Sequence, residues 1–280
     1  MKLGVGEWGF RELEFEEHCK IAANLGFRYL ELGTGGDFIG RLSADMSDQA
    51  QRLLRECIAD YGLKTPFMCV ENDFTKGSRA DLEQSLEQLH KEALFAQKFG
   101  VTHLRLFAGF TPIANFTEQT WSNMLDALRT ANEICQSLGM QISIETHGAL
   151  TPFGMGVKHT PTASTDKAAL KRMLKSLPDS VGINFDPGNL KPVQRESLES
   201  YADLLENRIN YCHLKDWIQN DDGSWTAAGV GDGDIDWQSL LKKIHYDGIY
   251  LIEYEPTHDV EDGIRRSLDF LRRIVPEIEL

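Results

Sequence analysis

The sequence predicts an α/β protein that forms a single (β/α)₈ TIM barrel over residues 1–280. Three observations lead to this prediction. Short apolar segments alternate eight times with longer amphipathic segments. The amphipathic segments repeatedly end in glycine, and the first four of these glycines are 36, 38 and 39 residues apart, the length of one strand and helix with their loops. No stretch rich in proline or serine divides the chain.

Each repeating unit contributes one strand and one helix. The strands are expected at about 2–7, 28–33, 64–70, 103–108, 141–146, 181–186, 209–214 and 249–254. They are short and rich in Ile, Val, Leu and aromatic residues, which is typical of strands covered on both faces. The helices are expected at about 15–25, 47–61, 79–99, 117–138, 165–177, 197–207, 236–246 and 260–274. An open doubly wound sheet is the alternative arrangement, but eight units in a chain of this length favour a barrel.

The composition is that of a globular protein, with 41% hydrophobic and 26% charged residues. The net charge of −14 argues against nucleic acid and anionic membranes as partners, because both are bound mainly through Lys and Arg. We expect no membrane-spanning segment and no signal peptide, since long apolar runs are missing. The five cysteines form no CxxC pair, which indicates reduced thiols in a cytoplasmic protein.

Four consecutive predicted strands each end near a residue that can bind a metal ion: Glu145, Asp186, His213 and Glu253. The carboxyl ends of barrel strands form one rim, where active sites of this fold are built. Side chains alternate between the two faces of a strand, and this alternation points all four residues into the barrel. We therefore expect the four side chains to meet at the barrel mouth.

Three carboxylates and one imidazole suit a single divalent ion, such as Mn²⁺, Mg²⁺, Co²⁺ or Zn²⁺. Without a cation, the carboxylates would repel one another. A metal ion chelated by a substrate carbonyl and a neighbouring hydroxyl would stabilise an enediolate. A carboxylate could then remove a proton from carbon and return it, which would epimerise or isomerise a sugar.

Five segments resemble, in order, the site motifs of the xylose isomerase-like barrel superfamily, which includes sugar isomerases and epimerases. They are Ile144–Gly148, Phe185–Asn189, His213–Asp216, Gly229–Trp237 and Ile252–Glu253. The resemblance implies that Glu145 and Glu253 both bind the metal, with Mn²⁺ as the expected ion, and exchange a proton with the substrate. It implies that Asp186 and His213 are metal ligands only. Many members carry a substrate-binding histidine where this chain has Asn189, and their arginine after the strand-seven histidine is replaced here by Trp217 and Ile218.

Further residues near the strand ends are candidates for substrate binding: His147, Asn189, Lys215, Trp8 and Phe107. Lys215 would polarise a substrate oxygen or form a salt bridge with a rim acid, and His147 would bind hydroxyl groups or support the site. Trp8 and Phe107, with Phe10 and Trp217, would form an apolar wall or simply pack. Glu7 and Glu31 are weaker candidates for hydrogen bonds to substrate.

The expected function is a metal-dependent isomerase or epimerase of a keto sugar. The alternative is a dehydratase of a cyclic keto-polyol, such as an inosose, that uses the same site. The loops after strands seven and eight, where barrels usually bind phosphate, are acidic, so we expect an uncharged sugar or polyol. A DNA-repair endonuclease is disfavoured by the negative charge, and a non-catalytic barrel by the four intact ligands. The sequence leaves a homo-oligomer open.

Overall fold

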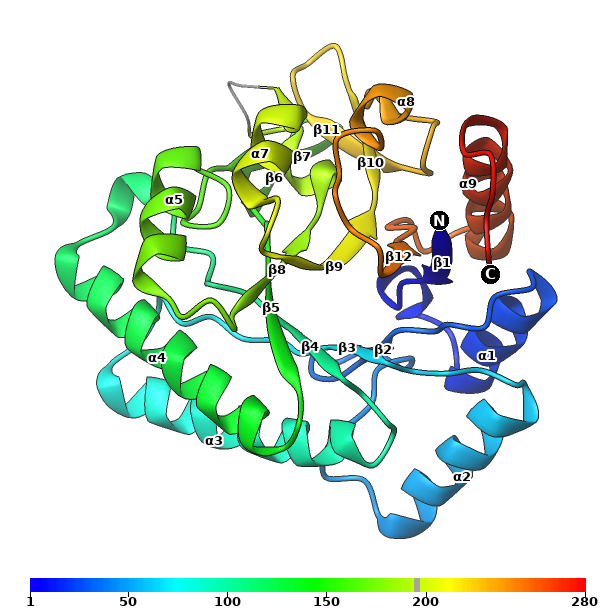
Figure 1. The fold of residues 1–280 in the computed structure, drawn as a ribbon, viewed down its shortest axis with the longest axis horizontal. Coiled ribbons are helices and arrows are strands. Elements are labelled where there is room, and N and C mark those ends of the chain that lie inside the picture. The colour runs from blue at the N-terminus through cyan, green and yellow to red at the C-terminus, as the bar shows by residue number, and fades with distance from the viewer. Residues whose placement is uncertain (194–196) are drawn as a thin grey trace.

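The computed structural model describes residues 1–193 and 197–280, and eight parallel strands form its central sheet (Figure 1). Along the sheet, neighbouring strands follow the order β1-β12-β9-β8-β5-β4-β3-β2. The strands are β1 (Lys2–Val5), β2 (Leu32–Gly33), β3 (Phe67–Cys69), β4 (His103–Leu106), β5 (Gln141–Glu145), β8 (Gly182–Phe185), β9 (Ile209–Leu214) and β12 (Ile249–Ile252).

The sheet closes into a barrel between β1 and β2, the two strands at the ends of this order. Val5 forms a parallel bridge with Leu30, just before β2. The Val5 N–H donates to the Tyr29 carbonyl at 3.0 Å, and the Glu31 N–H donates to the Val5 carbonyl at 3.0 Å. The predicted α/β barrel is therefore confirmed, and the open doubly wound sheet is excluded.

The segment Gly4–Gly9 matches the sequence motif G-x-G-x-x-G of a dinucleotide-binding turn, but it does not form the strand-turn-helix unit of that motif. Only Gly4 and Val5 of this segment belong to β1, and the short 3₁₀ helix η1 (Trp8–Phe10) follows. A Cβ on Gly9 would lie 2.0 Å from the Tyr254 carbonyl oxygen. This glycine is needed because the chain after β1 passes directly over the chain after β12.

Helices surround the sheet in Figure 1. Eight of the helices in the described residues correspond to the predicted ones: α1 (Phe15–Asn24), α2 (Asp48–Asp60), α3 (Arg79–Gln97), α4 (Glu118–Ser137), α5 (Lys167–Ser176), α7 (Leu198–Leu205), α8 (Trp237–Leu240) and α9 (Val260–Ile274). The start of α3 shows how sequence sets a boundary. Ser78 accepts a hydrogen bond from the Asp81 N–H, and the Asp81 carboxylate accepts one from the Ser78 N–H. Leu82 and Leu89 of this helix are buried, as its apolar stripe predicts.

One predicted helix is much shorter than expected. The pattern predicted a helix over 236–246, whereas α8 ends at Leu240. The Tyr246 hydroxyl donates to the carbonyls of Asn210, at 3.2 Å, and Ile249, at 3.4 Å. These bonds hold the non-helical segment after α8 against the chain at β9 and β12.

A second, antiparallel sheet was not predicted. It consists of β10 (Asp216–Gln219), β11 (Trp225–Ala228), β7 (Gly156–Thr160) and β6 (Ala149–Phe153), in that spatial order. Its strands come from the loops after β5 and β9, so it lies at the carboxyl end of the barrel strands. Because β6 is largely exposed and contains Pro152, it lacks the apolar run that marks a strand in sequence. Two further short helices are η2 (Ile113–Asn115) and α6 (Pro187–Leu190).

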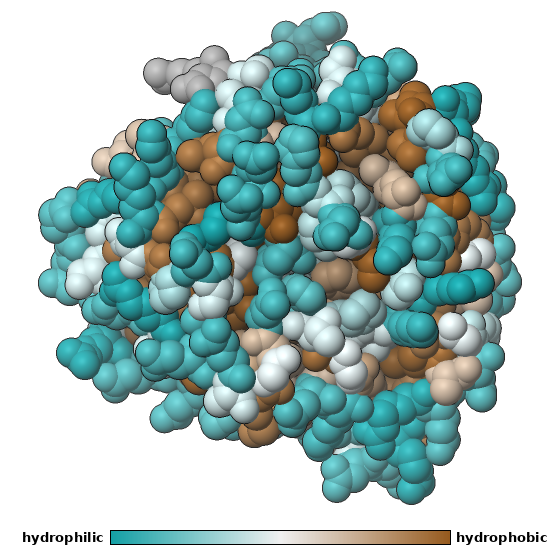
Figure 2. All heavy atoms as spheres, in the orientation of Figure 1, coloured by the Kyte–Doolittle hydropathy of each residue, from teal (hydrophilic) through white to brown (hydrophobic). Residues whose placement is uncertain are grey.

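The main apolar core lies between the barrel sheet and the helices. Inside the barrel, Phe67, Tyr211 and Leu251 form a small apolar cluster. The rings of Phe67 and Tyr211 are stacked, with their centres 4.4 Å apart. The face seen in Figure 2 is mostly hydrophilic. All five cysteines lie within the described residues and carry free thiols. None of the helices in the described part of the chain has the length and apolar character to cross a membrane.

The packing of α1 leads to a prediction about acid stability. His18 is 1% exposed, and its Nε2 lies 2.9 Å from the Phe10 carbonyl and 3.0 Å from the Leu13 carbonyl. Burial, only partly offset by these bonds, lowers the pKa of His18 to about 4. Between about pH 6.5 and 4 the unfolded chain would therefore bind a proton that the folded chain resists, so stability falls as the pH drops.

For His18→Gln, which does not titrate, the stability lost between pH 7 and pH 5 should be smaller by roughly 2 kcal/mol than for the wild type. Urea unfolding of both proteins at the two pH values measures this difference. Equal losses in the two proteins would contradict the prediction.

Candidate metal centre and substrate cavity

The four side chains predicted to meet at the barrel mouth do so. Glu145 ends β5, Asp186 follows β8, His213 lies in β9 and Glu253 follows β12. One ligand atom from each lies within 4.8 Å of all the others, and all four residues are buried. They meet because they occupy inward positions at the same end of neighbouring parallel strands.

The distances between these atoms suit a shared ion. His213 Nδ1 lies 3.7 Å from Glu145 Oε1, 3.9 Å from Asp186 Oδ2 and 3.5 Å from Glu253 Oε2. Ligand bonds of about 2.0–2.2 Å to one ion place neighbouring ligand atoms about 3 to 3.5 Å apart. Three buried carboxylates that face one imidazole nitrogen form a donor set for a divalent cation. The residues present therefore fit a metal ion, although they do not select one.

Each of the two glutamates is paired with a different positively charged side chain. Arg105 Nε lies 3.0 Å from Glu145 Oε2. Lys215 Nζ lies 2.5 Å from Glu253 Oε2, 2.9 Å from Glu255 Oε2 and 3.5 Å from Asp186 Oδ2. The prediction for Lys215 left open a polariser and a salt bridge, and the structure contains the salt bridge. Arg105 was missed, although a charged residue at an inward position of an otherwise apolar strand was a usable signal.

The two glutamates differ in proton affinity. Burial would raise the pKa of Glu145, but the Arg105 guanidinium and His213 lower it well below its usual range. Burial raises the pKa of Glu253 despite His213 and Lys215, and it raises that of Asp186 to about 7 despite Lys215. Burial would lower the pKa of His213, but Glu253 and Glu31 raise it well above its usual value. Of the two glutamates, Glu145 thus has the lower pKa.

Asn189, a predicted substrate-binding residue, contacts two of the four proposed ligands. It is not among the residues that line the cavity. Its side-chain NH₂ donates to Glu145 Oε1 at 2.8 Å and to Asp186 Oδ2 at 2.9 Å, and its backbone N–H donates to Asp186 Oδ1 at 3.0 Å. Asp186 is also the N-cap of α6, so the Pro-Gly turn after β8 places Asn189 beside the carboxylates. The amide orients two candidate ligands.

A cavity of about 160 Å³ opens beside the four side chains. Its wall combines apolar and charged residues: Trp8, Glu71, Arg105, Phe107, Phe110, Glu145, His147, Leu150, Lys215, Glu253 and Glu255. Trp8, Phe107, His147 and Lys215 thus lie where substrate-binding residues were expected. The His147 ring packs edge-on against Phe107, with ring centres 5.0 Å apart.

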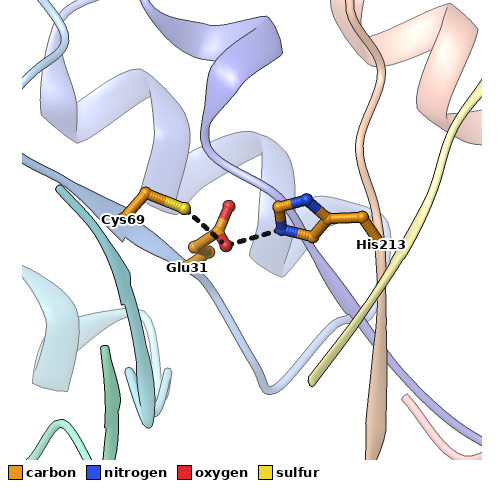
Figure 3. Close-up of side chains that lie close together, drawn as sticks. All are labelled: Glu31, Cys69 and His213. Carbon is orange, nitrogen blue, oxygen red and sulfur yellow. Dashed lines mark hydrogen bonds and ion pairs between the residues drawn. The ribbon is translucent and has the colours of Figure 1, made fainter. Parts of the chain in front are cut away.

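The weaker candidates lie outside this wall. Phe10 stacks on His18, and Trp217 packs against His159. Glu7 is buried, and its Oε1 lies 3.3 Å from Arg41 Nη2. Glu31 lies between Cys69 and His213, as Figure 3 shows, with its Oε1 2.8 Å from His213 Nε2. Burial would raise the pKa of Glu31, but His213, Cys69 and Tyr211 lower it to about 2.

Known proteins share this fold over nearly the whole chain. The chain is 26% identical to inosose dehydratase of Geobacillus kaustophilus over 258 residues, covering 80% of this chain and 77% of that protein. It is 23% identical to L-ribulose-5-phosphate 3-epimerase of Salmonella paratyphi C over 245 residues, covering 85% of this chain and 81% of that protein. The crystal structure of the IOLI protein with a binding zinc atom matches with a TM-score of 0.79 at 17% identity, covering 98% of both chains.

These sequence relatives are enzymes: an epimerase and a dehydratase. The model of one family, the xylose isomerase-like TIM barrel, matches residues 19–274. This chain therefore belongs to the xylose isomerase-like TIM barrel family.

Proposed function

We propose that this protein is a metal-dependent isomerase or epimerase of a keto sugar. The observation that carries the proposal is the convergence of two glutamates, an aspartate and a histidine beside a cavity, with a separate cation on each glutamate. Glu145, Asp186, His213 and Glu253 would hold one divalent ion. When bound, that ion would supply Lewis-acid stabilisation of negative charge on the substrate oxygens.

The two glutamates would move the proton. Glu145, held ionised by Arg105, is suited to accept a proton from the substrate carbon. Glu253, whose pKa is raised, is suited to donate one. Two carboxyl groups with separated pKa values form an acid and base pair, which is what inversion or isomerisation of a sugar carbon requires.

The wall of the cavity favours an uncharged substrate. Among the described residues, the Lys and Arg side chains that line it are Arg105 and Lys215, and both are in ion pairs with carboxylates. The wall also contains Glu71 and Glu255, outside the four proposed ligands. A phosphate group would meet these acids without a free cation to compensate. The aromatic side chains of Trp8, Phe107 and Phe110 offer apolar contact to the carbon face of a sugar or polyol.

The dehydratase of a cyclic keto-polyol is the second candidate, and Lys215 favours it. Removing a hydroxyl group requires a proton donor beside the leaving oxygen. The Lys215 ammonium lines the cavity, and despite its burial the three carboxylates around it raise the pKa of Lys215, so it stays protonated and would donate a hydrogen bond to the leaving oxygen. The inosose dehydratase relative is consistent with this candidate, and the ribulose-phosphate epimerase relative with the first.

Reactions in D₂O followed by NMR separate the two candidates. The protein, loaded in turn with Mn²⁺, Mg²⁺, Co²⁺ and Zn²⁺, is incubated with uncharged ketoses, inososes and phosphorylated ketoses. We expect deuterium at a carbon next to the carbonyl of an uncharged ketose, together with a new isomer. A product that has lost water would establish the dehydratase instead. Turnover of phosphorylated ketoses alone would contradict the uncharged substrate, and no exchange with any compound would contradict both candidates.

A further inference from the structure

We infer that Glu31 is a positioning residue for the metal centre: it holds the His213 ring so that Nε2 carries the proton and Nδ1 faces the carboxylates. This inference rests on the metal site of the proposed function. It assigns a role to a residue that touches neither the cavity nor the other three proposed ligands.

Glu31 accepts hydrogen bonds from residues of β3 and β9 and from the chain after β1. Its Oε1 accepts from His213 Nε2 at 2.8 Å, from the Cys69 thiol at 3.0 Å and from the Tyr211 hydroxyl. Its Oε2 accepts from the Glu7 backbone N–H at 2.9 Å. Glu31 and His213 are both 0% exposed, so no solvent competes for these bonds. A carboxylate held on both oxygens cannot turn away from the imidazole.

The hydrogen bond between Glu31 and His213 determines which nitrogen of the His213 ring can bind a metal ion. A neutral imidazole has one N–H, and an ionised carboxylate can only accept. In the neutral imidazole, the form that binds a metal ion, the Glu31 bond therefore keeps the proton on Nε2 and leaves the lone pair on Nδ1, the nitrogen that faces Glu145, Asp186 and Glu253. The Asn184 side-chain nitrogen lies 3.2 Å from Nδ1, a contact that a bound metal ion would displace.

The same cluster could be interpreted as a second metal site, since ligand atoms of Glu31, Cys69 and His213 also lie within 4.8 Å of one another (Figure 3). Two contacts argue against this. The Cys69 thiol donates its proton to Glu31 Oε1 at 3.0 Å, whereas a cysteine that binds a metal ion does so as the thiolate. The Tyr211 hydroxyl already occupies Glu31 Oε1. The cluster is a hydrogen-bond network that supports His213 from behind.

Glu31→Gln tests this role with little change in volume. The glutamine can present its NH₂ to His213, which would move the ring proton to Nδ1 and block the lone pair. We expect Co²⁺ and Mn²⁺ to bind about 10- to 100-fold more weakly, measured by isothermal titration calorimetry. Glu133→Gln is the matched control, because it makes the same substitution at an exposed position of α4, away from the metal centre. It should change the affinity by less than about threefold.

A second measurement does not depend on a variant. In ¹⁵N-labelled wild-type protein with Zn²⁺, long-range ¹H–¹⁵N spectra should show His213 with its proton on Nε2. A proton on Nδ1, or an unchanged metal affinity in Glu31→Gln, would overturn the inference. If the wild type itself binds none of these ions, the proposed metal site fails instead, so the two failures are distinguishable.

Discussion

Glu145→Gln and Glu253→Gln should each lower turnover by about 10³-fold or more, since a positioned acid or base contributes roughly 10² to 10⁴-fold and each residue is also a proposed ligand. An amide keeps the shape of the side chain but cannot accept or deliver the proton. Steady-state rates with metal held in excess, on the substrate found in D₂O, measure the loss.

The two variants should differ in their effect on folding. Glu145→Gln leaves Arg105, which is 3% exposed, without its carboxylate partner, and removing one member of a buried pair costs about 3–5 kcal/mol. Lys215 keeps Glu255 as a partner when Glu253 is replaced, so this variant should lose less stability. Glu133→Gln on the exposed face of α4 is the matched control and should retain full activity. Turnover within a fewfold of the wild type in either site variant would contradict the assigned roles.

The double variant Asp186→Asn, His213→Ala should lose the metal altogether. It removes one charge and the only nitrogen of the proposed donor set, while Glu145 and Glu253 remain. Two carboxylates without the imidazole retain a transition metal poorly. After loading and dialysis, mass spectrometry of the metal content should find about one ion per wild-type chain and almost none per variant chain.

A matched double variant controls for the loss of charge and ring. Asp126→Asn with His245→Ala replaces the same residue types at exposed positions, so its metal content should equal that of the wild type. Circular dichroism should show that both double variants are folded. A stoichiometric divalent ion in Asp186→Asn, His213→Ala would show that the metal site lies elsewhere.

Local patterns predicted the repeating architecture well because each unit signals its own boundaries. The apolar stripe and the serine cap of α3 are features of neighbouring residues, and they specify a helix whatever the rest of the chain does. The prediction failed where contacts beyond the segment decide the structure. The chain after α8 is not helical, and Tyr246 bonds there to Asn210 and Ile249, while the exposed strand β6 has no apolar pattern of its own.

The position of Asp186 at the barrel mouth followed from sequence alone, and so did those of Glu145, His213 and Glu253. Parallel strands end at one rim, and the two-residue alternation of a strand fixes which side chains point inward. Only the tertiary structure decided which side chains surround them: Arg105 beside Glu145, Asn189 between two carboxylates, and Glu31 behind His213. Glu31 and His213 are 182 residues apart, and no local pattern records a contact that forms only when the barrel closes.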